Sequence, residues 1–279
     1  MINFKKERDL GAVISDTFKF LRLEWRGLLS VILSTALIPV ISIFVLSIFN
    51  GIELMDNISN ANAFFQFSFL TFVVYFLFIL VYNLIGLSVL SYIKVYINNS
   101  GTVEVSKVYP IIKSNLINYF ILGIITTFLI IIGSVFCLVP GIYLGVVFSV
   151  TGSMLVFEQK GIFDAIGDSF SFVNWKWWET FGTLFVMFLI LYISMVVFSI
   201  PSVIYSFIKM GTLMAEQDME SFNSIMKDPI YIVLAFISNL GQHLLYAISA
   251  ISVALIYFDI NEQKNATGSL EMIDSIGKD

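Results

Sequence analysis

The chain has 279 residues, of which 58% are hydrophobic and only 13% are charged, and its mean hydropathy is +0.91. This composition excludes an ordinary soluble domain and is typical of a polytopic membrane protein. The formal net charge of -5 excludes the basic balance of a nucleic-acid-binding protein, and the single cysteine, Cys137, excludes an intramolecular disulfide.

Long uncharged runs predict the membrane spans. The runs are bounded by charged residues, and His243 is the only histidine within them. At about 1.5 Å per helical residue and about 30 Å of hydrocarbon, they provide six spans. We expect these at about residues 27–49, 64–93, 119–139, 141–157, 181–208 and 230–257. The predicted fold class is all-α, with amphipathic surface helices beside the spans.

The two ends of the chain are more polar than its centre. Residues 1–26 are expected to form an N-terminal amphipathic surface helix, residues 27–259 a six-span membrane domain, and residues 260–279 a polar, mobile cytoplasmic tail. The apolar stripe of the first helix is formed by Ile14, Phe18, Leu21 and Trp25.

A proline-glycine pair divides the central apolar run into a hairpin. No charged side chain lies between Lys113 and Glu158, and Val139-Pro140-Gly141 interrupts the run near its middle. Proline has no N–H to donate and does not continue a helix, so we expect the turn at Pro140.

The distribution of basic residues predicts the topology. If the six spans alternate in direction, all of the 15 lysines and arginines except Lys209 and Lys227 lie on one side. Cytoplasmic loops of membrane proteins are enriched in lysine and arginine, so both termini are expected to be cytoplasmic.

Two segments of the chain are similar to each other. Residues 14–21 align without a gap on residues 166–173, an offset of 152 positions, and Trp25 then aligns with Trp177. The pattern indicates a unit of one surface helix and a two-span hairpin, used three times, with residues 103–118 before the third span. Convergence of amphipathic aromatic helices is the alternative.

A small polar cluster is predicted inside the membrane. Asn239, Gln242 and His243 share one face of the sixth span, and Asn83 in the second span is a candidate partner. One interpretation is that they form interhelical hydrogen bonds with a neutral imidazole. The other is that they form a ligand site or a proton pathway.

A further set of residues resembles a family signature. The set runs from Val139-Pro140-Gly141-Ile142-Tyr143 through Val156-Phe157-Glu158, Gly161, Ala165 and Ser169 to Trp177-Trp178, and ends with Ile256-Tyr257-Phe258-Asp259. It resembles the membrane domain found beside some bacterial glycerophosphodiester phosphodiesterases and in related inner-membrane proteins. The resemblance implies a multi-pass protein of the bacterial cytoplasmic membrane. Ser149 and Asn261 stand where that family has basic residues.

The resemblance also bears on activity. The enzymes of that family hydrolyse with a separate barrel domain that uses paired histidines, carboxylates and a metal, whereas this chain has one histidine. The resemblance therefore implies that this chain corresponds to the membrane-anchoring part of that architecture, with no enzymatic activity, metal or cofactor. Glu158 is interpreted as a boundary charge that receives a lysine or caps a helix, with a ligand role as the alternative.

Three functions follow from these features. The first is a non-enzymatic anchor or scaffold subunit, with membrane lipids and other membrane or membrane-associated proteins as partners and no nucleic acid. The second is a transporter or lipid-handling protein with a polar site between helices. An intramembrane enzyme that combines His243 with Ser88, Ser91 or Ser194 ranks third, because no motif supports it.

Overall fold

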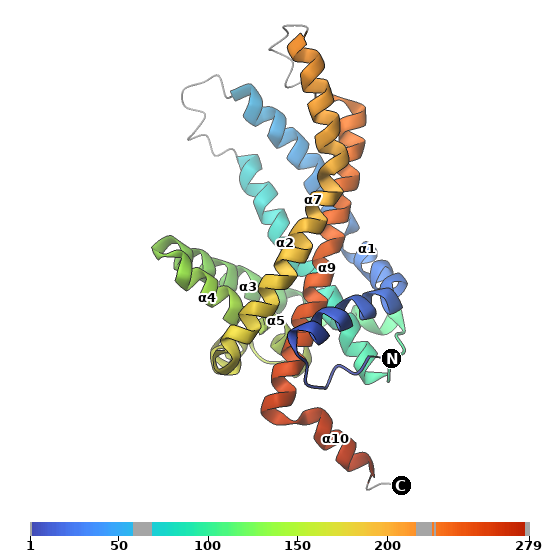
Figure 1. Ribbon diagram of the computed structural model, residues 1–279, viewed down its shortest axis with the longest axis vertical. Coiled ribbons are helices and arrows are strands. Elements are labelled where there is room, and N and C mark those ends of the chain that lie inside the picture. The colour runs from blue at the N-terminus through green and yellow to red at the C-terminus, as the bar shows by residue number, and fades with distance from the viewer. Residues whose placement is uncertain (1, 58–68, 216–224, 226, 277–279) are drawn as a thin grey trace. The chain divides into compact units, whose positions relative to one another are not determined.

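The computed structural model describes residues 2–57, 69–215, 225 and 227–276 (Figure 1). All regular structure in these residues is helical, and six helical stretches are long and apolar enough to cross a membrane. These are Leu10–Gly51, Phe69–Asn98, Val105–Phe136, Leu138–Glu158, Ile162–Thr212 and Pro229–Asn265. The predicted all-α fold with six spans is confirmed. The expected start of the second span at Phe64 lies outside the described residues.

The chain is divided into two compact units. Unit 1 consists of Met1–Thr35, Asn83–Leu189 and Ala247–Asp279, and unit 2 consists of Ala36–Tyr82 and Ile190–Tyr246. Four long helices contribute to both units: α1 (Leu10–Asn57), α2 (Phe69–Asn98), α7 (Trp177–Ala215) and α9 (Pro229–Asn265). The expected domain limits at residues 26 and 259 are not helix ends, because α1 and α9 run through them.

The first part of α1 is amphipathic, but its buried face differs from the expected stripe. Val13, Thr17 and Phe20 are buried in unit 1, whereas Phe18 and Trp25 are exposed. The face that packs against the protein is thus one residue earlier than the predicted stripe. Both faces carry apolar residues, so periodicity alone does not separate the face that packs from the face left for lipid.

The central hairpin is formed by α3 (Val105–Phe136) and α4 (Leu138–Phe148), which lie side by side in Figure 1. Its turn is at Cys137, which has an extended backbone with φ -170° and ψ 147°. The prediction of a turn at Pro140 is wrong by three residues, because Pro140 lies in the first turn of α4. Proline is tolerated there since the first N–H groups of a helix have no intrahelical acceptor.

Gly141 allows the two helices of this hairpin to approach closely. A Cβ atom at Gly141 would overlap the Ser134 hydroxyl, and one at Gly133 would lie 3.3 Å from the Gly141 nitrogen. Small residues at such a contact permit tight backbone packing between membrane helices. The proline-glycine pair therefore shapes the packing of the hairpin rather than its turn.

The predicted fourth span is not one continuous α-helix. After α4, a turn at Ser149 and Val150 leads into α5 (Thr151–Ser153) and a π-helical turn, Met154–Glu158. Gln159 then adopts a left-handed backbone with φ 58°. The predicted surface helix follows as α6 (Ile162–Val173), which a 3₁₀ turn (Asn174–Lys176) connects to α7.

Unit 1 has an aromatic core that includes the N-terminal segment. Five rings pack mostly edge to face with centroid distances from 5.1 to 6.5 Å: Phe4, Phe20, Tyr92, Tyr96 and Phe258. The Ile2 amide also donates to the Tyr96 hydroxyl at 2.9 Å. Each such ring pair contributes about 0.5–1.5 kcal/mol beyond its buried area.

The C-terminal residues form a short helix that a buried carboxylate caps. Helix α10 (Thr267–Ile276) follows α9 in unit 1. The buried Glu262 carboxylate accepts hydrogen bonds from the backbone N–H groups of Gly268 at 2.6 Å and Ser269 at 2.9 Å. These contacts cap the α10 N-terminus, where a negative charge is favourable. The polar segment expected after residue 259 thus contains the end of α9 and the capped helix α10.

Candidate functional site

The predicted intramembrane cluster centres on His243, which is only 4% exposed in unit 2. Its imidazole stacks nearly parallel to the rings of Phe78 and Tyr82, with centroid distances of 6.0 and 5.8 Å. Its Nδ1 lies 2.8 Å from the Asn239 carbonyl oxygen. A carbonyl only accepts, so Nδ1 carries the proton of this bond and the neutral ring presents Nε2 as an acceptor.

Two polar atoms of this cluster have no hydrogen-bond partner among the described residues. They are His243 Nε2 and the Asn239 side-chain oxygen, and both are buried. Gln242, on the same helical face, is half-buried. Buried polar atoms are nearly always hydrogen-bonded in folded proteins, so two neighbouring acceptors call for a donor such as a water molecule or a ligand hydroxyl.

Asn83 lies in the other unit. Its side chain packs against Gly123 of α3 within unit 1, where a Cβ atom on Gly123 would overlap the Asn83 amide. Asn239, Gln242 and His243 belong to unit 2. Within unit 1, Asn83 therefore contributes to the packing of α2 on α3, and the other three predicted residues lie on α9 in unit 2.

The signature residues form a packed cluster in unit 1. The Tyr143 hydroxyl donates to the Asn174 side chain at 2.8 Å, and the Tyr143 ring lies 6.1 Å from that of Trp177. Ser169 is fully buried and donates to the Ile166 carbonyl of its own helix. These side chains join α4, α6 and α7.

Glu158 connects three segments of unit 1. Its carboxylate accepts a hydrogen bond from the Tyr257 hydroxyl at 2.7 Å and pairs with Lys160 at 2.7 Å. Lys160 also pairs with Asp168 at 2.9 Å. Partial burial works to lower the pKa of Lys160, but the bonds to Glu158 and Asp168 raise it overall. The expectation of a boundary charge that receives Lys160 is confirmed, whereas sequence reasoning missed Tyr257.

Sequence reasoning also missed a buried arginine. Arg8 donates from Nε to Asp16 at 3.0 Å and from its other nitrogens to carbonyls of the N-terminal segment, including that of Phe4. Its backbone N–H donates to Asp259 at 2.6 Å. Burial lowers the pKa of Arg8, and Asp16 and Asp259 oppose this shift. The carboxylate that binds the Arg8 amide is 251 positions away, so no local pattern reveals it.

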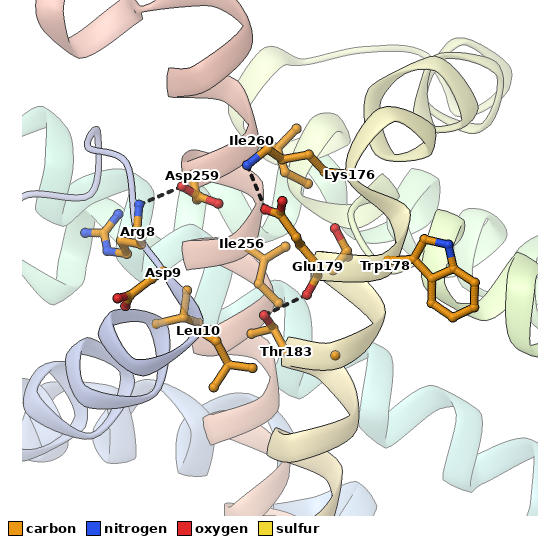
Figure 2. Close-up of a pocket in the computed structure, with 13 residues that line it drawn as sticks. Arg8, Asp9, Leu10, Lys176, Trp178, Glu179, Thr183, Ile256, Asp259 and Ile260 are labelled. Carbon is orange, nitrogen blue, oxygen red and sulfur yellow. Dashed lines mark hydrogen bonds and ion pairs between the residues drawn. The ribbon is translucent and has the colours of Figure 1, made fainter.

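Two of the cavities among the described residues lie near helix ends in unit 1. One, of about 230 Å³, is lined by residues that include Lys5, Lys94, Glu158 and Tyr257. The other, of about 320 Å³, lies between the start of α1, the start of α7 and the end of α9 (Figure 2). Among the described residues, no group of three or more histidines, cysteines or carboxylates is arranged to hold a metal ion.

The fold and these sites define an all-α, multi-pass membrane protein. No family model matches the chain, and neither the curated proteins nor the solved structures contain a match. The resemblance to the phosphodiesterase-associated membrane domain therefore rests on the sequence signature, and the function has to be argued from the sites themselves.

Proposed function

We propose that this chain is a non-enzymatic integral membrane protein that anchors or scaffolds a partner protein. The observation that carries the proposal is helix α10, a capped helix with an exposed apolar face. Leu270 is 57% exposed and Ile273 is 64% exposed, and their i, i+3 spacing places both on one side of the helix. An apolar helix face of this kind fits a groove on a partner.

The attachment of α10 favours docking over a flexible link. Glu262 caps the helix from α9, and Gly268 packs so closely on the Lys5 backbone that a Cβ atom there would overlap it. A helix that is already ordered loses less entropy when it binds than a disordered tail does. The charged residues Arg8, Asp16 and Glu158 have structural partners within unit 1, which further supports a scaffold.

The test is copurification in mild detergent with the chain at its endogenous level. We expect wild type to bring down a partner protein and the double variant Leu270→Asp/Ile273→Asp to lose it, because two carboxylates prevent burial of the apolar face. The matched control is Thr102→Asp/Ser106→Asp, which adds the same charge at exposed positions outside α10. Recovery of this chain alone from wild type would count against a scaffold, as would equal loss in the control.

A second candidate function is supported by the unpartnered acceptors of His243 and Asn239. A transporter or lipid-handling protein uses buried polar groups near the middle of the membrane to receive a substrate. This reading requires a donor group on the substrate that reaches Nε2. A substrate-dependent phenotype that is lost in a folded His243 variant would favour it over the scaffold.

We further propose that the protein lies in a bacterial cytoplasmic membrane with both termini in the cytoplasm, and that it is related to the phosphodiesterase-associated membrane domain. The basic residues support the orientation, since Lys209 and Lys227 fall in unit 2 and the other lysines and arginines fall in unit 1. The signature residues support the relationship, because they build the contacts between α4, α6 and α7.

A further inference from the structure

The 320 Å³ cavity of unit 1 combines apolar walls with charged side chains at its edge. Its walls come from Leu10 and Val13 of α1, Thr180 and Thr183 of α7, and Ile256 of α9. The cavity lies where the apolar run of α7 begins and that of α9 ends. The exposed Trp178 indole borders it, and tryptophan is enriched at headgroup depth.

Most charged groups around this cavity already have partners. The Arg8 guanidinium binds Asp16 and backbone carbonyls, and in Figure 2 it points away from Asp259 and Glu179. Lys176 Nζ pairs with the exposed Glu179 carboxylate at 2.7 Å. Figure 2 shows this ammonium between Ile260 and Glu179. Lys176 is therefore held at the cavity by a single carboxylate.

Two polar side chains in the cavity wall can each accept a further hydrogen bond. Asp259 is only 9% exposed, and its Oδ1 accepts from the Arg8 amide at 2.6 Å and from the Gln263 side chain at 2.7 Å. No described residue donates to its Oδ2, which Figure 2 shows on the side facing Glu179. Thr180 is 3% exposed, and its hydroxyl has no hydrogen-bond partner among the described residues.

These groups have the chemistry to receive a small zwitterion. A buried carboxylate oxygen without a donor favours an ammonium that can donate hydrogen bonds, and a threonine hydroxyl can accept a second one. A lysine ammonium with one carboxylate partner can also receive a phosphate oxygen. The Asp9 carboxylate, which caps α1 through the Ala12 amide at 2.7 Å, adds negative charge on the Asp259 side.

We propose that this cavity binds a phosphoethanolamine group, with its ammonium at Asp259 and Thr180 and its phosphate at Lys176. The group can come from phosphatidylethanolamine in the membrane or from free phosphoethanolamine in the adjoining water. A choline headgroup has the same charges but no N–H donor, so the site discriminates against it. This inference is independent of α10 and of any protein partner.

The experiment is native mass spectrometry of the full chain from nanodiscs that contain equal amounts of phosphatidylethanolamine and phosphatidylcholine. We expect wild type to retain the ethanolamine lipid preferentially. Asp259→Asn and Thr180→Val should each reduce the ratio of ethanolamine to choline adducts, by about tenfold or more for Asp259, since its hydrogen bond is charge-assisted. Glu104→Gln, at an exposed carboxylate outside the cavity, should leave the ratio unchanged.

A second measurement separates the two sources of the group. Millimolar phosphoethanolamine added to the chain in detergent should raise the melting temperature if the free molecule suffices, and choline phosphate should not. A preference seen only with the lipid assigns the site to the membrane. Equal retention of both lipids by wild type would overturn the proposal, as would an unchanged ratio in folded Thr180→Val. Valine has nearly the shape of threonine, so Thr180→Val is expected to fold. This variant therefore tests the proposal even if Asp259→Asn does not fold.

Discussion

At the scale of single residues, His243 decides between the structural and the transport interpretation of the intramembrane cluster. In the structure its Nδ1 donates to the Asn239 carbonyl, and its ring stacks on Phe78 and Tyr82. A glutamine can replace this donor, because its amide carries both N–H groups and an acceptor. It cannot reproduce the stacked ring, so some packing is lost.

We predict that His243→Gln assembles normally and keeps the biological phenotype. Its melting temperature should fall by a few degrees, which corresponds to about 1 kcal/mol for hydrogen-bond and ring contacts in a membrane protein. Thermal unfolding in detergent and complementation of a deletion strain are the measurements, with His243→Ala as the larger truncation. A variant that folds and assembles but loses the phenotype would favour the transport interpretation.

Asp228 provides a prediction on pH in unit 2. Its carboxylate accepts from the Tyr205 hydroxyl at 2.8 Å, and it pairs with Lys209 at 3.0 Å. The hydrogen bond from Tyr205, followed by that from Lys209, lowers the pKa of Asp228 to about 2. A carboxylate with a lowered pKa stabilises the fold fully above its unfolded pKa near 3.8, and this stabilisation is lost as the pH falls toward about 2.

We therefore expect Asp228→Asn to melt at a lower temperature than wild type at pH 6. The difference between the two proteins should shrink between about pH 4 and pH 2, because protonated Asp228 resembles asparagine. Melting curves of both proteins across this range in detergent provide the check. A difference that stays constant with pH would show that the ionised carboxylate does not contribute.

At the scale of helices, the predicted repeat gains structural support. The buried residues Val13, Thr17 and Phe20 of α1 correspond, at the same offset of 152, to Ala165, Ser169 and Phe172 of α6, which are also buried. The same offset relates the ion pair of Arg8 and Asp16 to that of Lys160 and Asp168. Convergence would have to reproduce both the buried positions and the ion pair, so these correspondences favour the repeat.

The two equivalent ion pairs should differ in strength. Arg8 is buried beside Asp16, so Asp16→Asn removes the carboxylate partner of a buried charge and should cost up to about 3–5 kcal/mol. Asp168 is mostly exposed, so Asp168→Asn should cost about 0–1 kcal/mol. Chemical or thermal unfolding of the two variants in one detergent compares them. Equal losses would mean that burial of Arg8 does not set the strength of its pair.

The limits of sequence prediction are also visible at this scale. The spans were predictable because an uncharged run of about 20 residues has few uses outside a membrane. The hairpin turn was misplaced because Pro140 is compatible with either a turn or a first helical turn. The hydrogen bond between the Arg8 backbone amide and Asp259 joins opposite ends of the chain, so it required tertiary structure.

At the scale of the whole molecule, the topology is the remaining prediction. Six spans and the distribution of the basic residues predict that both termini lie in the cytoplasm. In a Cys137→Ser background, cysteines at Ser106 and Ser269 should be protected from an impermeant maleimide in intact cells. A cysteine at the exposed Lys227 should react. All three positions should react after permeabilisation, and labelling of Ser106 but not Lys227 in intact cells would reverse the orientation.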